Sequence, residues 1–349
     1  MSSSTNRRKF IRNAALAGIG FGIVRNASGM SIAPYVFPAS AGKIMEGGKV
    51  GIIGLDTSHS AEFTKLINAS NSGFKVTIAY PKGSSDIESS YSRIPAITEE
   101  MKKLGIEIAA SLDELIAKCD VVCLETNDGR IHLQQALPVL KAGKRLFIDK
   151  PIAASLADAM AIFNASKKYK VSVFSASSLR FSAGLQALTK SETVGKIMGA
   201  ETYSPCALEK THPDLFWYGI HGVESLFTLM GTGCTTVVRV YTPGADVVVG
   251  TWKDNRIGSF RGTREGAHDY GGTVFGDKAV APLPAFEGYE PLIERILEFF
   301  KTGIVPVSPE ETLEICAFME AADESKKRGG VPVKVADIFK RAEAKQKSF

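Results

Sequence analysis

Short apolar segments alternate with amphipathic segments from residue 49 onward. The apolar segments predict buried strands over residues 50–54, 75–79, 106–109, 121–125 and 145–149. The segments between them predict helices over residues 61–68, 97–104, 112–118 and 131–141. Strands that alternate with helices are typical of a parallel sheet covered by helices. The pattern therefore predicts an α/β fold that begins with a Rossmann-like, doubly wound parallel sheet over residues 42–151.

Local signals indicate where several of these helices begin and end. Ser111, with Glu114 three residues later, has the spacing of a capping box at the start of helix 112–118. Gly143 is expected to end helix 131–141. Ser155 is expected to begin a further helix that reaches about Lys168.

The pattern changes after residue 151. Apolar and alternating segments predict strands over residues 171–175, 235–241, 246–252, 256–261 and 273–275, and two final helices over 289–302 and 309–327. Strand-rich sequence without regular helical crossovers is typical of antiparallel pairing. We expect residues 152–349 to form an α+β domain with a large, mostly antiparallel sheet, for substrate binding and oligomerisation.

The amino-terminal residues 1–41 have the arrangement of an export signal. The pair Arg7-Arg8 precedes a weakly apolar stretch, residues 14–24, and Ala39-Ser40-Ala41 resembles a cleavage site. The stretch is shorter than the ~20 residues of a membrane span, so no stable membrane anchor is expected. The arginine pair resembles a twin-arginine signal, which predicts passage through the twin-arginine translocase to the periplasm. The alternative is a basic tail.

Charge and cysteine content narrow the function further. The 349 residues include 42 basic and 37 acidic side chains, and five of the basic ones lie in residues 1–41, where no acid occurs. The remainder is balanced, which gives no reason to expect a nucleic-acid partner. The five cysteines lack the paired spacing of a zinc site, so no metal is expected there.

The turn after the first strand is the first candidate site. A dinucleotide-binding turn carries three glycines, but here only Gly54 is present; Asp56 replaces the second glycine and His59 the third. Thr57 and Ser58, at a helix start, offer hydroxyl and N–H groups to an anion. The alternative is a capped helix without a nucleotide, with Asp56 or Ser58 as N-cap.

The loop after the second strand bears on the choice of nucleotide. It contains Lys82, Ser84 and Ser85 and lacks the acid that an NAD site usually places directly after this strand. Lysine and serine side chains can hold a 2′-phosphate, so NADP is favoured over NAD. An ordinary exposed loop is the alternative.

Several motifs further along the chain occur together in one known family. They are Thr126-Asn127 after a strand, then His132, Ala142-Gly143-Lys144 and Phe147-Ile148-Asp149-Lys150-Pro151-Ile152-Ala153. Their combination resembles the Gfo/Idh/MocA oxidoreductases, named after glucose-fructose oxidoreductase and inositol dehydrogenase. The resemblance spans roughly residues 48–330 and is weakest at the glycine turn.

The resemblance implies roles for the residues around the Lys-Pro pair. It implies that Thr126, Asn127, Asp149 and Lys150 contact NADP or NAD, tightly bound, with Lys150 beside both nicotinamide and substrate. Asp149 stands where the family usually has glutamate. Independently of the resemblance, an amine at the carboxyl end of a parallel strand can bind a sugar hydroxyl and stabilise negative charge on its oxygen. The alternative is a surface lysine paired with Asp149.

A second group of candidate residues follows in the second domain. His221 matches the family's general base, and a histidine pKa near 6.5 suits proton abstraction. Trp217 occupies a position where the family commonly has aspartate, and with Tyr218 it can stack on a sugar face. Arg180 resembles a position near the cleft, although an ordinary salt bridge is equally compatible with the sequence. A buried structural role is the alternative for His221.

Two further features bear on chemistry. Residues 209–224 contain a potential set of oxygen and nitrogen ligands for a metal, but their spacing matches no closed tetrahedral site; they are Glu209, His212, Asp214, His221 and Glu224. We therefore expect no metal. His268 lies in a glycine-rich segment that can either reach the cleft or lie on the surface.

Together these residues predict a periplasmic oxidoreductase acting on a hydroxyl of a small carbohydrate: a sugar, glycoside or polyol. One alternative keeps the nucleotide trapped in a self-contained redox cycle that cleaves a glycoside. Another is a non-catalytic sugar-binding protein that has lost the nucleotide, which Asp56 and His59 in the glycine turn favour. The family resemblance also implies a homo-oligomer formed through the open sheet.

Overall fold

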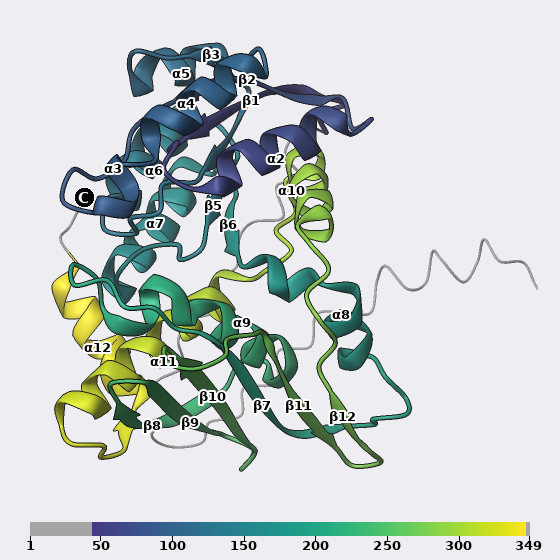
Figure 1. Cartoon of the computed structure of the whole chain (residues 1–349), viewed down its shortest axis with the longest axis vertical. Coiled ribbons are helices and arrows are strands. Elements are labelled where there is room, and N and C mark those ends of the chain that lie inside the picture. Colours follow the sequence, from purple (N-terminus) through teal and green to yellow (C-terminus); the bar gives the residue numbers. More distant parts are fainter. Residues whose placement is uncertain (1–43, 347–349) are drawn as a thin grey trace, which may run out of the picture. The chain divides into compact units, whose positions relative to one another are not determined.

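The computed structural model describes residues 44–346, which belong to one compact unit, Tyr35–Phe349. Figure 1 shows this part of the chain coloured along the sequence. The predicted export signal, residues 1–41, lies outside the described residues. Among the described residues, no helix has the length and apolar character to cross a membrane.

The first half of the chain forms a six-stranded parallel sheet with the order β3-β2-β1-β4-β5-β6. Its strands are β1 (Gly48–Ile53), β2 (Phe74–Tyr80), β3 (Glu107–Ile108), β4 (Val121–Leu124), β5 (Leu146–Asp149) and β6 (Val173–Ala176). The intervening helices are α2 (Ser58–Ala69), α3 (Glu88–Tyr91), α4 (Ile94–Lys103), α5 (Leu112–Lys118), α6 (His132–Lys141) and α7 (Leu156–Tyr169). The predicted doubly wound sheet is confirmed. The strand order reverses between β1 and β4, and ligands of such sheets bind beside this point at the carboxyl ends of the strands.

The parallel sheet is buried on both faces, which explains its nearly continuous apolar strands. Phe147 on β5 and Phe174 on β6 pack in one hydrophobic cluster, together with Phe299 and Phe300. The last two belong to α10 (Glu290–Thr302), which lies beside α2 in Figure 1. A helix from the carboxyl-terminal part of the chain therefore completes the core of the amino-terminal sheet.

The second half contains a seven-stranded sheet with the order β12-β11-β7-β10-β9-β8-β13. Its strands are β7 (Ile197–Pro205), β8 (Cys234–Thr242), β9 (Ala245–Trp252), β10 (Ile257–Thr263), β11 (Gly271–Gly276), β12 (Val280–Pro282) and β13 (Val333–Lys334). Within this described sheet, β7 and β10 pair in parallel and the other neighbours pair antiparallel. The predicted α+β fold with a mostly antiparallel sheet is confirmed.

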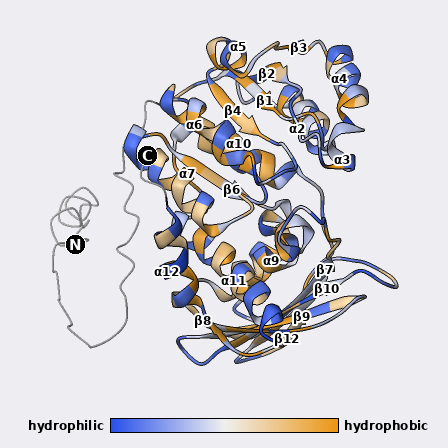
Figure 2. Cartoon of the chain, turned by 90° about the vertical axis from the view of Figure 1, so that its left-hand side faces the viewer, coloured by the Kyte–Doolittle hydropathy of each residue, from blue (hydrophilic) through white to orange (hydrophobic). Residues whose placement is uncertain are grey.

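Helices cover one face of this second sheet. They include α9 (Ile220–Met230) and α11 (Pro309–Lys327), which Figure 2 shows between the two sheets, and α12 (Val335–Lys345) near the carboxyl end. Trp252 on β9 contacts Phe227 of α9 and Phe318 of α11 through their rings. The short helices η1 (Ser178–Phe181), α8 (Ala183–Thr189) and the π-helical turn η2 (Leu215–Gly219) lie along the path between β6 and α9.

Several helix ends agree with their sequence signals. Ser111 Oγ accepts a hydrogen bond from Glu114 N at 3.1 Å, and Ser155 Oγ accepts one from Asp158 N at 3.1 Å. Gly143 follows α6 with a φ of +77°, a conformation that favours glycine. Because these capping signals are local, the ends of these helices could be predicted from the sequence.

Some elements were not expected from the sequence. Strand β7, in the middle of the second sheet, and the terminal helix α12 were missed. Strand β6 belongs to the parallel sheet although it lies beyond residue 151, so the predicted division after that residue does not coincide with the end of this sheet.

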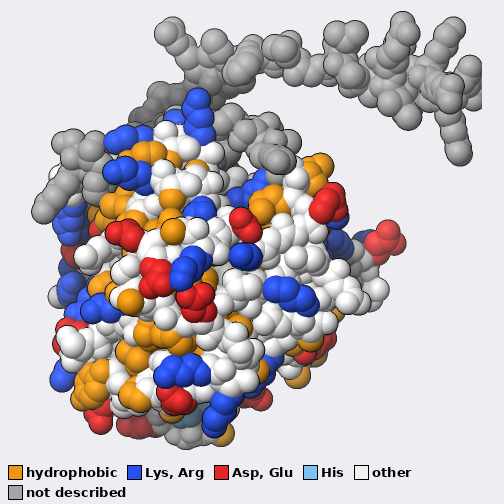
Figure 3. Space-filling view, turned by 90° about the horizontal axis from the view of Figure 1, so that it is seen from above, with side chains coloured by type: hydrophobic (Ala, Val, Ile, Leu, Met, Phe, Trp, Pro, Cys, Tyr) orange, Lys and Arg blue, Asp and Glu red, His pale blue; other side chains and the backbone are white. Residues whose placement is uncertain are grey.

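The surface reflects the balanced charge of the sequence. Figure 3 shows basic and acidic side chains interspersed on the face seen from above. This face gives no indication of a strongly basic surface of the kind that binds nucleic acid.

Candidate functional site

The first part of the candidate site lies at the carboxyl end of β5. Asp149 is the last residue of this strand and Lys150 follows it. Asp149 Oδ2 lies 2.8 Å from His59 Nδ1 and 3.6 Å from Lys150 Nζ. The pKa of the Asp149 carboxyl is held well below its usual range: burial alone would raise it, but the charges of His59 and Lys150 and the hydrogen bond from His59 outweigh burial. The site therefore contains an ionised carboxylate that is bonded to His59 and lies near the Lys150 ammonium.

His221 comes to the same region from the first turn of α9 and is buried, with 6% of its surface exposed. Its Nδ1 lies 2.7 Å from Ser177 Oγ, just beyond β6. When Nδ1–H donates to this oxygen, Nε2 carries the lone pair and can accept a proton. Burial lowers the pKa of His221 well below its usual value, and the charges of Lys150 and His59 lower it further. His221 is therefore neutral near pH 7, as a general base must be.

Four aromatic side chains connect the two histidines, and we call them the aromatic arc. They are Tyr218, Tyr270, Phe286 and Tyr289. The ring of Tyr218 lies 5.0 Å from that of His221, and Tyr289 lies 4.9 Å from His59. The hydroxyl oxygens of Tyr218 and Tyr270 are 3.0 Å apart. Of these four, only Tyr218 was predicted from the sequence, because the other three lie in irregular segments without a motif.

The glycine turn retains a close backbone approach at Gly54. Its φ is +95°, and an added Cβ would come within 2.4 Å of the Thr126 amide nitrogen. Thr57 is the N-cap of α2, since its Oγ1 accepts a hydrogen bond from His59 N at 3.4 Å. The predicted caps Asp56 and Ser58 were therefore wrong. Ser58 is instead the exposed first residue of the helix.

The carboxyl group of Asp56 points into the protein interior. The residue is fully buried, and its Oδ2 accepts a hydrogen bond from Ser90 Oγ at 2.6 Å while its Oδ1 accepts one from Asn127 N at 3.1 Å. Burial raises the pKa of Asp56 to about 6 despite these bonds. The acid that replaces the second glycine thus links three segments of the first domain.

Unpartnered polar atoms mark the carboxyl ends of β4 and β5. Among the described residues, Glu125 Oε1 and Oε2, Thr126 Oγ1, Asn127 Oδ1 and Asp149 Oδ1 are buried without a hydrogen-bond partner. Apart from the Thr126 hydroxyl, these atoms are acceptors when the acids are ionised. Burial raises the pKa of Glu125 well above its usual range, which favours its protonated form. The set offers acceptors at Asn127 and Asp149 and donors at the Thr126 hydroxyl and the protonated Glu125 carboxyl, which fits the hydroxyls and the carboxamide of a nicotinamide nucleotide.

A cavity of about 840 Å³ lies between the loops that follow β2 and β4. Its lining includes Lys82 and Ser85 on one side and Gln134 and Gln135 on the other. In a doubly wound fold this position suits the adenosine end of a dinucleotide. Both side-chain amide atoms of Gln135 are buried without a partner among the described residues, which agrees with a polar ligand here.

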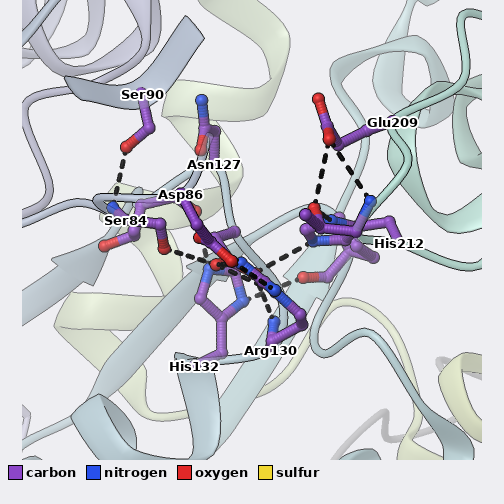
Figure 4. A network of polar contacts seen from close by, with 12 residues as sticks. Ser84, Asp86, Ser90, Asn127, Arg130, His132, Glu209 and His212 are labelled. Atoms are coloured by element: carbon purple, nitrogen blue, oxygen red, sulfur yellow. Dashed lines mark hydrogen bonds and ion pairs between the residues drawn. The ribbon is translucent and has the colours of Figure 1, made fainter. Parts of the chain in front are cut away.

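Asp128 organises the edge of this cavity, and we call its polar surroundings the Asp128 cluster: Ser84, Asp86, Asp128, Arg130 and His212. Figure 4 shows the labelled members of this cluster gathered in one place. Asp128 is fully buried, and its carboxylate accepts hydrogen bonds from the Ser84 hydroxyl and from Arg130, and lies 3.0 Å from His212 Nε2. Arg130 also binds Asp86 at 2.7 Å. This cluster was not predicted from the sequence, because its members come from three separate loops.

Other predicted residues have different surroundings. Arg180 is buried in ion pairs with Glu224 and Glu311, both at 2.7 Å, as the salt-bridge alternative requires. The Trp217 ring contacts His212 at 4.9 Å, whereas Tyr218 contacts His221. His268 is exposed. Within the described part of the chain, no group of three or more histidine, cysteine or acidic side chains is arranged to hold a metal ion.

Comparisons with known proteins agree with this geometry. Residues 48–177 match the Gfo/Idh/MocA model, described as an oxidoreductase family with an NAD-binding Rossmann fold. An uncharacterized oxidoreductase of Streptococcus pneumoniae is 25% identical over 199 residues, which are 52% of this chain and 50% of that protein. The chain thus matches about half the length of this curated relative.

Solved structures share the fold over most of the chain. A probable dehydrogenase from Thermotoga maritima has a TM-score of 0.70 at 19% identity, covering 83% of this chain and 99% of that one. The scyllo-inositol dehydrogenase of Lactobacillus casei, solved with NAD(H) and scyllo-inositol, has a TM-score of 0.67 at 17% identity, with the same coverage. At these identities the likeness establishes the fold alone.

Proposed function

We propose that this chain, whose residues 48–177 carry the NAD-binding Rossmann domain of the Gfo/Idh/MocA oxidoreductase family, oxidises a hydroxyl group of a sugar, glycoside or polyol. The observation that carries the proposal is the meeting of Lys150 and His221. Lys150 follows Asp149 at the end of β5, and Asp149 is the register partner of Ala176 on β6. Ser177, the next residue after β6, lies with its Oγ 2.7 Å from His221 Nδ1, so His221 reaches the strand ends beside Lys150. A cation and a neutral base therefore face one region.

These two side chains have complementary tasks in alcohol oxidation. A CH–OH group becomes a carbonyl by losing the hydroxyl proton and a hydride from carbon. His221 Nε2 takes the proton, and the Lys150 ammonium stabilises the negative charge that develops on the oxygen. The nicotinamide of NAD or NADP, when bound, supplies the hydride acceptor.

The surroundings of His221 support its role as the base. The neighbouring ammonium of Lys150 disfavours a second positive charge, so the neutral form persists at neutral pH. Ser177 fixes the ring through Nδ1, which orients Nε2. This neutrality and orientation are what proton abstraction from an alcohol requires.

The substrate class follows from the chemistry of the walls. The aromatic arc offers ring faces and hydroxyls, which suit the apolar face and the hydroxyl rim of a sugar or cyclic polyol. The scyllo-inositol dehydrogenase, which shares this fold, was solved with such a polyol. We therefore place the substrate among small carbohydrates.

The nucleotide would be held along the carboxyl ends of the parallel strands. Thr57 and Ser58 at the start of α2 would face the diphosphate, Thr126 and Asn127 the nicotinamide ribose, and Lys82 a 2′-phosphate. The exposed Lys82 favours NADP. We propose that the nucleotide is tightly bound.

We also propose that the protein acts in the periplasm after twin-arginine export, and as a homo-oligomer. The first part rests on the sequence of residues 1–41 and the second on the family resemblance. A tightly bound nucleotide suits a compartment to which the protein is exported already folded. Replacing Arg7-Arg8 by Lys-Lys and measuring periplasmic protein tests the route: unchanged export would contradict it.

The test of the proposed function uses Lys150→Met and His221→Asn with the purified full chain. The wild type is assayed for absorbance of reduced nicotinamide on a panel of sugars, glycosides and polyols. Each variant is expected to lose roughly a hundredfold or more in kcat. Lys141→Met and His268→Asn, at exposed positions, are the matched controls. Turnover that survives in both active-site variants would contradict the proposal.

A further inference from the structure

Two nitrogen-bearing side chains approach one oxygen of Asp149 at unequal distances. His59 Nδ1 lies 2.8 Å from Asp149 Oδ2, which is a full hydrogen bond, whereas Lys150 Nζ lies 3.6 Å away, beyond hydrogen-bond distance. Oδ2, the Asp149 oxygen that Lys150 Nζ approaches, is therefore bonded to His59. The Lys150 ammonium makes no hydrogen bond to Asp149.

The protein holds the His59 ring from several sides. The ring stacks on Phe63 at 4.9 Å with an interplanar angle of 16°, and the edge contact with Tyr289 is also 4.9 Å. His59 N is bonded to Thr57 Oγ1 at the start of α2. Only 8% of the residue is exposed. The orientation of Nδ1 toward Asp149 is thus imposed by α2 and by the segment before α10.

The position of His59 in the chain makes this arrangement unusual. It stands where a dinucleotide-binding turn carries its third glycine, which allows close packing of helix on strand. Here the same position contributes a ring that reaches the end of β5. The turn therefore supplies a side chain to the region of Lys150 in addition to its helix N-terminus.

We infer that His59 is a positioning residue: by occupying Asp149 Oδ2, it keeps the Lys150 ammonium available to the substrate oxygen. This inference rests on the role proposed above for Lys150. Without the imidazole, Asp149 Oδ2 would be free to take a direct hydrogen bond from Lys150 Nζ. The charge of the lysine would then be neutralised by Asp149 rather than by the developing charge on the substrate.

The groups around His221 define how His59 affects the base. Those that face it are Lys150 and Asp149 at the end of β5, His59 on α2, Ser177 after β6, and Tyr218 and Tyr270 of the aromatic arc. Positive charge on His59 lowers the pKa of His221, while the charge of Asp149 raises it. His59→Ala and Asp149→Asn should therefore move the acidic limb of the pH–rate profile in opposite directions, upward and downward.

The direct test measures Lys150 without nucleotide or turnover. Wild type, His59→Ala and His59→Asn are treated briefly with acetic anhydride, and the acetylated fraction of the peptide containing Lys150 is measured by mass spectrometry. We expect acetylation to fall several-fold in His59→Ala, because the Lys150 amine then forms a direct hydrogen bond with Asp149. His59→Asn should restore the rate, since an amide nitrogen can donate to Oδ2 in place of Nδ1.

A double variant separates positioning from loosening of the structure. In an Asp149→Asn background, His59→Ala should leave the acetylation of Lys150 unchanged, because the effect is transmitted through the carboxylate. General loosening would instead raise acetylation in His59→Ala in either background. Acetylation in His59→Ala equal to or above that of the wild type would overturn the inference, with His268→Asn as the control.

Kinetic measurements complete the test. His59→Ala should lower kcat about tenfold with little change in substrate KM, since Lys150 acts mainly on charge that develops in the transition state. An unchanged kcat, or pH limbs of His59→Ala and Asp149→Asn that move together, would contradict the inference. If Lys150 acetylation responds as expected while the wild type oxidises no alcohol, the positioning of Lys150 is supported and the proposed function is refuted.

Discussion

Replacing Asp128 by asparagine removes one negative charge from the centre of the Asp128 cluster while keeping its size. The carboxylate is fully buried and accepts hydrogen bonds from Ser84 and Arg130, beside the buried ring of His212. These partners hold the pKa of Asp128 well below its usual range, although burial opposes them. The native state therefore depends on the ionised form.

The expected loss follows from the exposure of each partner. A hydrogen bond to a charged group is worth about 1.5–3 kcal/mol, and the bond from the buried Ser84 hydroxyl to the Asp128 carboxylate is of this kind. The Arg130 side chain is 34% exposed, which reduces its contribution to below about 1 kcal/mol. We expect Asp128→Asn to lower the free energy of unfolding by about 3 kcal/mol at pH 7.

Urea unfolding of the purified chain, followed by fluorescence and circular dichroism together, measures this loss. Because the folded-state pKa is depressed, the stabilisation is present above the pKa of the unfolded aspartate, about 4. It is lost as the pH falls below that value. The difference between wild type and variant should therefore be constant from pH 7 to 5 and shrink toward pH 3.

Asp86→Asn is the matched control, because it removes another acid that binds Arg130 but lies on the surface. Its effect on the free energy of unfolding should be much smaller than that of Asp128→Asn. Equal losses in the two variants would refute the reasoning, as would a difference between wild type and Asp128→Asn that grows on acidification.

Three further predictions concern the glycine turn and the base. Asp56→Asn should flatten the pH dependence of stability: the pKa of Asp56 is raised to about 6, so the wild type loses stability as the pH rises from about 4 through 6, and the variant should gain about 2 kcal/mol relative to it at pH 7.5, measured by urea unfolding. Gly54→Ala should cost about 3 kcal/mol or more and abolish nucleotide binding in calorimetry, because its φ is +95° and the Cβ meets the Thr126 amide. The acidic limb of kcat/KM should lie below pH 6.5, because the pKa of His221 is lowered; a limb at or above pH 6.5 would exclude His221 as the base.

The alternation of strands and helices could be predicted because each element of the first domain carries a local signal. Strands such as β4 are buried on both faces and are therefore continuously apolar. Ser111 and Ser155 cap their helices through bonds to residues three positions away, which sequence spacing reveals. Such short-range causes are visible without a structure.

Strand β7 could not be predicted with the same ease because its central place depends on partners distant in the chain. It pairs in parallel with β10 and antiparallel with β11, and its exposed face carries Met198 and Tyr203 beside Glu201, so its sequence lacks a clear alternation of polar and apolar residues. Helix α10 was predicted as a helix, but its packing on the first sheet through Phe299 and Phe300 is a tertiary property.

The candidate site likewise contains residues that sequence motifs predict and residues that only the tertiary structure brings together. Lys150 and His221 were identified from motifs, and in the structure Lys150 follows β5 while His221 contacts Ser177 at the end of the neighbouring strand β6. The Asp128 cluster and most of the aromatic arc were missed, because they are assembled from loops that carry no spacing rule. The buried orientation of Asp56 depends on Ser90, which no local pattern relates to the glycine turn.

The nucleotide content of the purified full chain tests the central claim most directly. The protein is denatured, and the supernatant is analysed by mass spectrometry for NAD, NADP and their reduced forms, with calorimetric titration of the same nucleotides into the intact protein. We predict about one nucleotide per chain, or saturable binding at one site that Gly54→Ala abolishes. An empty supernatant together with no heat of binding for any of the four nucleotides would contradict the account.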